Sequence, residues 1–516
     1  MKNIKFLVGL ATVMLLSSCQ IVIGSNTTSS GESSTLPSIS DTGNNSSNST
    51  TPPSTTTTPP SSTSSSTNQD QGVHNNTIRA VNEQLGWSTL ASTGNQKMLV
   101  VPVQLSGQKV WTSTMLSNLE AAFFGDSEDT TWESVSSFYR KSSWGALNIS
   151  GELTDPYVSS YTYNQLYNYG DNSSDYLINE WSSRNSLSNS KLKEYDQDKD
   201  GRLDCTVFIY SNSYDSNGVG FWAWCFYQDN NPNTSKPVVN NYMWASYDFL
   251  TEGYVDGFNS SKVDAHTFIH ESGHLLGLDD YYCYDESNSW DAAGQLEMQS
   301  YNVGDQNIYS KFALGWFTPT HASTSTSATY TIDTSATHPQ ALLINDSWNG
   351  TPFDEYLILE YYTPTGLNET DANHRYDTRD TMYNYRGIRL YHVDARLIKM
   401  DSRGNFMSYV DSIGNDGYAY FVGASNSYSY SYLNSPYNSV YRYVHLLDQG
   451  GRNRLNNGLG GSITKSMALW TQGNTFTPSS TFFYNGTRFN NGNVIGYSIT
   501  VTQTTTTQAT ITITKI

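Results

Sequence analysis

The five residues His270-Glu271-Ser272-Gly273-His274 constrain this chain more than any other stretch of its sequence. They lie in a segment, residues 261–278, whose apolar periodicity predicts a helix ended by a glycine. Residues four apart lie on one face of a helix, so both imidazoles can point at one ion. Neutral imidazole is a good ligand for Zn²⁺. The motif therefore predicts a helix that presents one face to a metal ion. The alternative is a plain helix that binds no metal.

The residues around the two histidines extend the pattern. Glu271 adjoins the first ligand, where a carboxylate can take a proton from an activated water and pass it to a leaving amine, as in HExxH zinc hydrolases. Gly277 allows a sharp turn after the helix. Asp280, ten residues after His270, occupies the third-ligand position of the longer metzincin pattern, which is usually His. A carboxylate is an acceptable zinc ligand. We favour Asp280, although the adjacent Asp279 can take the same role.

A methionine follows at a suitable distance. Met298, in the segment GQLEMQSYN, lies where metzincins place a methionine turn beneath the zinc site. A single Met more often belongs to a core, so this match supports the metal motif only in combination with it. His266 lies one turn before His270, and we expect it to be structural.

The segment HESGHLLGLDDYY resembles the HExGHxLGLPDxY motif of the immune inhibitor A-like family of secreted bacterial zinc metallopeptidases, with Asp279 where that family usually has Pro. Other segments are similar to that family as well: SVSSFYRKSSWGALNISGEL, SKFALGWFTP, YLILEYY, GIRLYHVD, LWTQGNTFTP and GYSITV. Together they cover most of residues 97–516. The resemblance implies a zinc-dependent endopeptidase with a mixed α/β catalytic domain and a β-rich C-terminal domain.

An acidic loop predicts a second ion. Residues 196–204 read DQDKDGRLD, with carboxylates at alternate positions around a glycine. This pattern matches the first nine positions of a Ca²⁺ loop, and the resemblance includes a similar Asp-rich loop. The expected ligands are Asp196, Asp198, Asp200, the backbone carbonyl of Arg202, and Asp204. The twelfth position is Val207 rather than a bidentate Glu, so another residue or water would complete the shell. A polar turn without an ion is the alternative.

The N-terminus is typical of an export signal. Residues 1–18 combine a basic start with an apolar stretch too short for a permanent membrane span. The sequence Leu-Ser-Ser-Cys that ends at Cys19 resembles a lipoprotein cleavage box, so we expect cleavage before Cys19 and lipid on it. Residues 19–76 are then the lipidated end and a Ser/Thr/Pro-rich stalk, whose composition predicts disorder. The alternatives are an ordinary secretory signal cut nearby and a short membrane anchor.

Beyond the stalk the pattern predicts an α+β chain. Helical and strand-like segments are mixed up to about residue 320, and later segments such as ATYTID and ATITITK alternate at period two. We expect a metzincin-like mixed α/β zinc metallopeptidase domain over residues 77–320. A β-rich, sandwich-like C-terminal domain is expected over residues 321–516. The net charge of −19 over 516 residues argues against a nucleic-acid-binding protein, which needs a basic face.

Three further patterns are weaker. His392 and Asp394 share one face of a predicted strand and could form another metal site. Tyr281 or Tyr282 could donate a hydrogen bond during catalysis. One disulfide plus one thiol is compatible with the cysteines after Cys19, which are Cys205, Cys225 and Cys283.

The sequence thus predicts a surface-tethered endopeptidase with Zn²⁺ and Ca²⁺, acting on extracellular proteins or peptides. We expect a monomer on the extracellular face of a bacterial cell membrane, held only by its lipid, or a secreted form. The main alternative is a catalytically inactive adhesin or glycan-binding surface lipoprotein built on a peptidase fold. A zinc hydrolase of another amide bond is a third possibility.

Overall fold

The computed structural model describes residues 77–215, 220–228, 230–251, 253, 262–284, 291–377, 379–427, 441–453 and 465–516. The predicted signal peptide (1–18), Cys19 and the predicted stalk (19–76) lie outside the described residues. The described chain mixes helices with several sheets, which confirms the α+β expectation. Among these residues, the search for a helix long and apolar enough to cross a membrane finds none.

The first part of the chain contains a six-stranded sheet with the order β2-β1-β5-β8-β6, and β3 pairs with β1. The pairs are parallel except for β6, which runs antiparallel to β8 and ends the sheet. Its strands are β1 (Gly94–Gln104), β2 (Leu147–Leu153), β3 (Tyr157–Val158), β5 (Thr206–Tyr210), β6 (Trp224–Tyr227) and β8 (Asn241–Ser246). The strand-like segments expected before residue 320 include β1 and β5.

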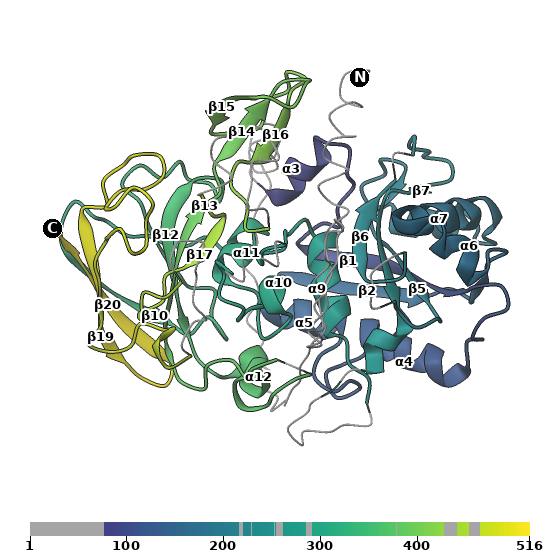
Figure 1. Ribbon diagram of the computed structural model, residues 1–516, viewed down its shortest axis with the longest axis horizontal. Coiled ribbons are helices and arrows are strands. Elements are labelled where there is room, and N and C mark those ends of the chain that lie inside the picture. Colours follow the sequence, from purple (N-terminus) through teal and green to yellow (C-terminus); the bar gives the residue numbers. More distant parts are fainter. Residues whose placement is uncertain are drawn as a thin grey trace, which may run out of the picture.

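Each face of this sheet is covered by its own helices, because alternate side chains of a strand point to opposite faces. Met98 and Val100 of β1 belong to one apolar core, whereas Leu99 and Val101 belong to another. The first core includes residues of α4 (Ser113–Phe124), α5 (Val135–Ser142) and α9 (His266–Leu275). The second includes residues of α6 (Tyr163–Tyr167), α7 (Ser173–Arg184) and α8 (Asn189–Leu192). The sheet is therefore the middle layer of three. Helix α9 lies on the same face as α4 and α5, near the centre of the molecule in Figure 1.

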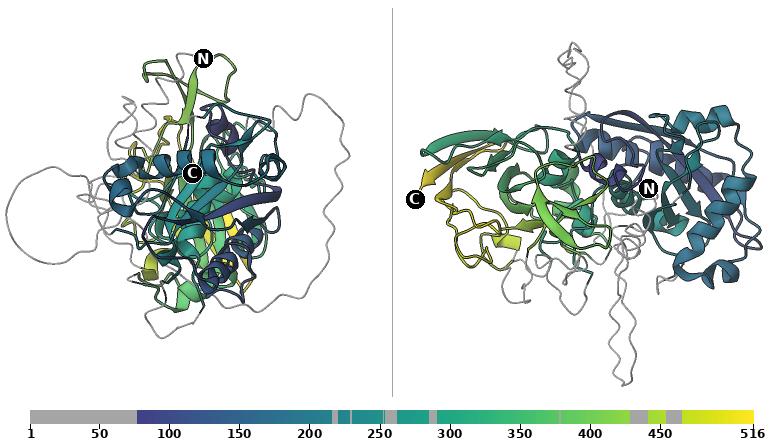
Figure 2. Two further views of the ribbon diagram at one scale, coloured as in Figure 1. Left: turned by 90° about the vertical axis from the view of Figure 1, so that its right-hand side faces the viewer. Right: turned by 90° about the horizontal axis from the view of Figure 1, so that it is seen from above.

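After residue 320 the described elements are mostly strands. A five-stranded sheet has the order β17-β13-β12-β11-β9, and a four-stranded sheet has the order β10-β20-β19-β18. The first contains β9 (Thr320–His321), β11 (Leu342–Ile344), β12 (Glu355–Tyr362), β13 (Gly387–Asp394) and β17 (Val444–Leu446). The second contains β10 (Ala328–Asp333), β18 (Thr475–Phe476), β19 (Tyr497–Thr504) and β20 (Gln508–Lys515). Residues of both sheets share one apolar core, and Figure 2 shows these strands at the end away from α6 and α7.

The opposite face of the five-stranded sheet packs on the first part of the chain. Two short helices, α10 (Met298–Tyr301) and α11 (Ile308–Ala313), lie at this junction. Tyr309 and Phe312 of α11 share a core with Tyr356 of β12 and Tyr391 of β13. The hydroxyls of Tyr309 and Tyr443 lie 2.7 Å apart. The strand-rich part therefore packs directly on the helices that follow the metal motif, through a shared apolar core.

The remaining described elements are small. A three-stranded sheet, β15-β14-β16, projects at the top of Figure 1 and is joined to α3 by hydrogen bonds between Gln84 and the backbone of Tyr420. The elements are α3 (Ile78–Glu83), α12 (Glu369–Asn373), β14 (Leu397–Met400), β15 (Phe406–Val410), β16 (Ala419–Val422) and the pair β4 (Arg202–Leu203) and β7 (Val238–Val239). The 3₁₀ turns are η1 (Gly170–Asn172), η2 (Lys193–Tyr195), η3 (Tyr247–Thr251), η4 (Gly366–Asn368) and η5 (Lys465–Met467).

Candidate metal centre

Helix α9 is shorter than the expected 261–278. It begins at His266, after the N-cap residue Ala265, and the carboxylate of Asp264 accepts a hydrogen bond from His266 N at 3.0 Å. The ring of His266 stacks on Trp132 with centroids 3.8 Å apart, so it faces the core rather than the two other histidines of the helix. The helix ends before Gly277, whose φ of 101° is favoured only by glycine.

Three donor atoms converge at the end of α9. His270 Nε2 lies 3.0 Å from Asp280 Oδ1, His274 Nε2 lies 3.3 Å from the same oxygen, and the two Nε2 atoms are 3.2 Å apart. Donors about 2.05 Å from a tetrahedral zinc ion would be roughly 3.3 Å from one another. The three atoms therefore already have the spacing of three corners of a zinc tetrahedron. This group could hold a metal ion.

A hydrogen bond from Nδ1 to a backbone carbonyl fixes the tautomer of each imidazole. His270 Nδ1 donates to the carbonyl oxygen of Met298 at 2.9 Å, and His274 Nδ1 donates to that of Leu278 at 2.8 Å. In the neutral rings the lone pairs then reside on Nε2, where they face each other and a carboxylate oxygen. Three acceptors directed at one point require a cation between them. The donor set of two imidazoles and one carboxylate suits Zn²⁺.

Met298, the predicted methionine turn, is buried at the start of α10. Its side chain joins the apolar core that contains Phe268 and Ile269 of α9. Its carbonyl is the acceptor for His270 Nδ1. The residue thus supports the ligand helix through both its side chain and its backbone.

The structure brings Asp280, not Asp279, to the two histidines. Asp280 is buried, and its second oxygen, Oδ2, accepts a hydrogen bond from the Tyr284 hydroxyl at 2.7 Å. Asp279 is exposed and is not part of the group of converging donors. Sequence reasoning considered Tyr281 and Tyr282 and missed Tyr284. The Tyr281 hydroxyl lies 3.1 Å from Ser310 Oγ in the core.

The charges of this group are strongly coupled. Burial alone would lower the pKa of His274, but the Asp280 carboxylate raises it to about 10. Burial alone would raise the pKa of Asp280, but the charge on His274 and hydrogen bonds to both imidazoles hold it well below its usual range. Without a metal, these opposite shifts favour a protonated His274 paired with an ionised Asp280 at neutral pH. A metal ion has to displace this proton when it binds.

Glu271 is fully buried on α9 beside His270. Its backbone carbonyl accepts a hydrogen bond from Cys225 Sγ at 3.1 Å, which ties the helix to β6. A pocket opens next to the donor group, and its lining includes Cys225, Phe226, Tyr227, His274, Asp280 and Tyr284. The pocket therefore reaches His274 and Asp280 along the edge strand of the first sheet, whereas His270 and Glu271 lie behind its lining.

Gly273 of the motif has a steric role. A Cβ atom at this position would collide with the side chain of Gln299, which lies directly over the helix. Gln299 Nε2 donates to the carbonyl of His270 at 3.3 Å, and Gln306 Nε2 donates to Gln299 Oε1 at 2.9 Å. The local sequence pattern does not indicate these two glutamines, because Gln299 contacts a helix residue 29 positions earlier in the chain.

The predicted calcium loop forms a compact acidic group. One carboxylate oxygen each of Asp196, Asp198 and Asp200 lies within 4.8 Å of the others, and this group could also hold a metal ion. Gly201 has a φ of 91°, and a side chain there would collide with the backbone of Asn233. The turn that gathers the carboxylates therefore requires this glycine.

Asp204 lies beside this group rather than in it. Its Oδ2 accepts a hydrogen bond from Gln197 N at 2.8 Å, while its Oδ1 is buried without a hydrogen-bond partner. Burial raises the pKa of Asp204 to about 7. A buried carboxylate oxygen without a donor is costly, and a nearby cation would offset that cost. The residue types and this orphan oxygen fit Ca²⁺.

Two arginines form ion pairs with carboxylates of this loop. Arg79 of α3 pairs with Asp198 at 2.7 Å, and the Arg202 side chain pairs with Asp200 at 2.8 Å. The predicted use of the Arg202 carbonyl as a ligand stays a prediction. An ion entering this loop would compete with both guanidinium groups.

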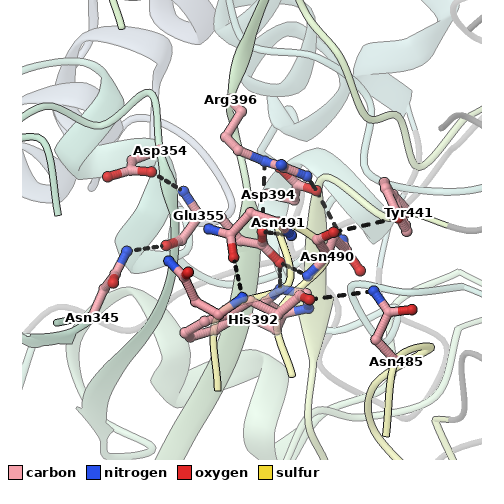
Figure 3. Close-up of polar contacts among 12 residues, drawn as sticks. Asn345, Asp354, Glu355, His392, Asp394, Arg396, Tyr441, Asn485, Asn490 and Asn491 are labelled. Atoms are coloured by element: carbon pink, nitrogen blue, oxygen red, sulfur yellow. Dashed lines mark hydrogen bonds and ion pairs between the residues drawn. The ribbon is translucent and has the colours of Figure 1, made fainter. Parts of the chain in front are cut away.

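The structure supports neither the second metal site predicted at His392 and Asp394 nor a disulfide among the described cysteines. His392 Nε2 lies 2.9 Å from Glu355 Oε1, and Arg396 binds Asp394 through two hydrogen bonds of 2.7 Å. Because Arg396 also pairs with Glu355 at 3.5 Å, His392 and Asp394 both belong to one network of ion pairs (Figure 3). Neither belongs to a group that could hold a metal among the described residues. No disulfide forms among the three cysteines in the described part of the chain, which are Cys205, Cys225 and Cys283.

Comparison with known proteins adds no assignment. The chain matches no protein-family model and no curated protein.

Proposed function

We propose that this chain is a zinc-dependent endopeptidase of extracellular proteins or peptides, held at the outer face of a bacterial cell membrane by a lipid on Cys19. We infer a metzincin-like catalytic domain over residues 77–320 followed by a β-rich C-terminal domain. The convergence of His270 Nε2, His274 Nε2 and Asp280 Oδ1 at mutual distances of 3.0, 3.2 and 3.3 Å carries the proposal. Buried imidazole and carboxylate atoms at this spacing support a metal site.

Bound to these atoms, Zn²⁺ supplies Lewis acidity toward a water molecule and a peptide carbonyl. The carboxylate of Glu271 accepts the proton of the water and returns it to the nitrogen of the leaving amine. The pocket beside His274 runs along β6, the last strand of its sheet. An extended peptide can pair with the backbone of an edge strand. These features favour a peptide substrate over a compact small molecule.

Removal of zinc is expected to abolish cleavage of fluorescently labelled casein, and restoration of zinc to recover it. The protein should contain about one zinc ion per chain, held by three protein donors. The measurement combines elemental analysis with cleavage rates after treatment with a zinc-selective chelator at constant Ca²⁺. Full activity of zinc-free protein would contradict the proposal. Folded, zinc-loaded protein that cleaves neither casein nor a peptide library would favour the inactive adhesin instead.

Calcium is expected to stabilise the fold through the loop of residues 196–204. An ion present at a hundredfold excess over its Kd adds about 2.7 kcal/mol to the free energy of unfolding. We expect Ca²⁺ to raise the midpoint of thermal unfolding, and Asp196→Asn to remove this response. Asp291→Asn is the matched control, because burial raises the pKa of Asp291 as it raises that of Asp196, but the Asp291 carboxylate accepts hydrogen bonds from Ala293 N, Gly294 N and Ser300 Oγ. A calcium response that survives Asp196→Asn would contradict this site.

This calcium effect should depend on pH. The pKa of Asp204 in the folded protein, about 7, lies above its ordinary value, so the folded state holds a proton that the unfolded chain loses between about pH 4 and 7. In calcium-free protein, Asp204 therefore lowers stability as the pH rises through this window. Ca²⁺ opposes that ionisation penalty, so its stabilising effect should be larger at pH 8 than at pH 5.5.

A further inference from the structure

The loop that carries Asp280 is fastened to a distant segment, residues 424–427, which follows β16. Ser427 Oγ donates to the backbone carbonyl of Asp280 at 2.9 Å, and Tyr284 N donates to the carbonyl of Ser427 at 2.8 Å. Tyr284 is also the residue whose hydroxyl binds the Asp280 carboxylate. One residue from the strand-rich part of the chain thus holds both Asp280 and the tyrosine that orients it.

Asn426 makes a second connection to the same loop. Its Nδ2 donates to the carbonyl of Tyr281 at 3.0 Å and to that of Val444, in β17, at 2.8 Å. Its Oδ1 accepts a hydrogen bond from Val444 N at 3.2 Å. The amide therefore joins the ligand loop to the edge of the five-stranded sheet. Asn426 and Ser427 are 3% and 5% exposed, so loss of either side chain leaves buried carbonyls without donors.

The third ligand depends on such support more than the first two. His270 and His274 are placed by α9 itself, and their rings are fixed by the carbonyls of Met298 and Leu278. Asp280 lies beyond the end of the helix, so its carboxylate is positioned by contacts of the loop. A zinc–oxygen bond of about 2.0–2.2 Å tolerates little displacement of the ligand.

We propose that Asn426 and Ser427 are positioning residues for the metal, so that the strand-rich part of the chain completes the metal centre. The proposal rests on the proposed function, because it takes Zn²⁺ to be the ion bound by Asp280. It assigns the region after residue 320 a role in metal affinity, in addition to any role in binding substrate.

The test compares zinc affinity among variants of the whole protein, by competition with a chelating dye. Loss of a partner that orients a metal ligand typically weakens metal binding by about 10–100-fold. We expect this range for Asn426→Ala and for Ser427→Ala, and near-parental affinity for Ser427→Thr, which keeps the hydroxyl. The matched control is Asn345→Ala. Asn345 is a buried amide of the same part of the chain, and it donates to the Glu355 carbonyl rather than to the loop that carries Asp280 (Figure 3).

A spectroscopic readout separates positioning from general destabilisation. The visible absorption of Co²⁺-loaded protein reports ligand geometry, so it should change in Asn426→Ala and stay parental in Asn345→Ala even if both variants lose thermal stability. Parental zinc affinity and a parental Co²⁺ spectrum in folded Asn426→Ala and Ser427→Ala would overturn this inference alone. Failure of the unaltered protein to bind zinc would overturn the proposed function and this inference together.

Discussion

Glu271→Gln is expected to lower kcat/KM for a casein-derived peptide by about 10²–10⁴-fold, the usual contribution of a general acid–base residue. Glutamine keeps the size of the side chain and its place on α9 but cannot accept the proton of the attacking water. The loss should appear in kcat, with KM and zinc content unchanged, because the three proposed zinc donors are untouched. Initial rates over a range of peptide concentrations, together with elemental analysis, measure these quantities.

Glu297→Gln is the matched control for this variant. Glu297 is likewise a fully buried glutamate, and it immediately precedes Met298 at the metal centre. Burial raises the pKa of Glu297 to about 8, so the group is mostly protonated at neutral pH and glutamine resembles it. Its Oε2 accepts a hydrogen bond from Asn307 Nδ2 at 3.0 Å. We expect activity within a few-fold of the parent. Equal rates for Glu271→Gln and the parent would remove Glu271 from the mechanism.

The features that could be predicted from sequence are those fixed by local pattern. The spacing of His270 and His274 placed both imidazoles on one helix face, and the glycine at 277 indicated the turn that returns Asp280 to them. Period-two alternation identified β10 and β20, which pair with each other as edge and centre of one sheet. In each of these cases the signal lies within about a dozen residues, where propensity and periodicity are informative.

The features that were missed depend on contacts between distant residues. Tyr284 looks no different from Tyr281 or Tyr282 in sequence, and only the path of the loop decides which hydroxyl reaches Asp280. Asn426 lies 145 residues from the backbone carbonyl of Tyr281, to which it donates. The expected helix start at residue 261 was wrong: α9 begins at His266, where the backbone N–H is bound by the carboxylate of Asp264. Tertiary packing, rather than local preference, determines each of these.

The adjacent aspartates provide a direct test of the metal centre. Asp280→Ala is expected to weaken zinc binding by more than the roughly 100-fold seen when a ligand's orienting partner is lost, because it removes a donor itself. The same substitution should also leave His270 Nε2 and His274 Nε2 without the carboxylate oxygen that lies 3.0 and 3.3 Å from them. With that charge gone, the pKa of His274 should fall from its raised value, since Asp280 is the group that raises it.

Asp279→Ala is the internal control, since it removes the same side chain one residue earlier. Asp279 is exposed and lies outside the group of converging donors, so zinc affinity should stay within about threefold of the parent. Chelator competition measures both variants under identical conditions. The reverse pattern, with Asp279→Ala abolishing binding and Asp280→Ala tolerated, would mean that the loop rearranges around the ion. In that case the hydrogen bonds of Ser427 and Tyr284 to Asp280 would describe the metal-free state alone.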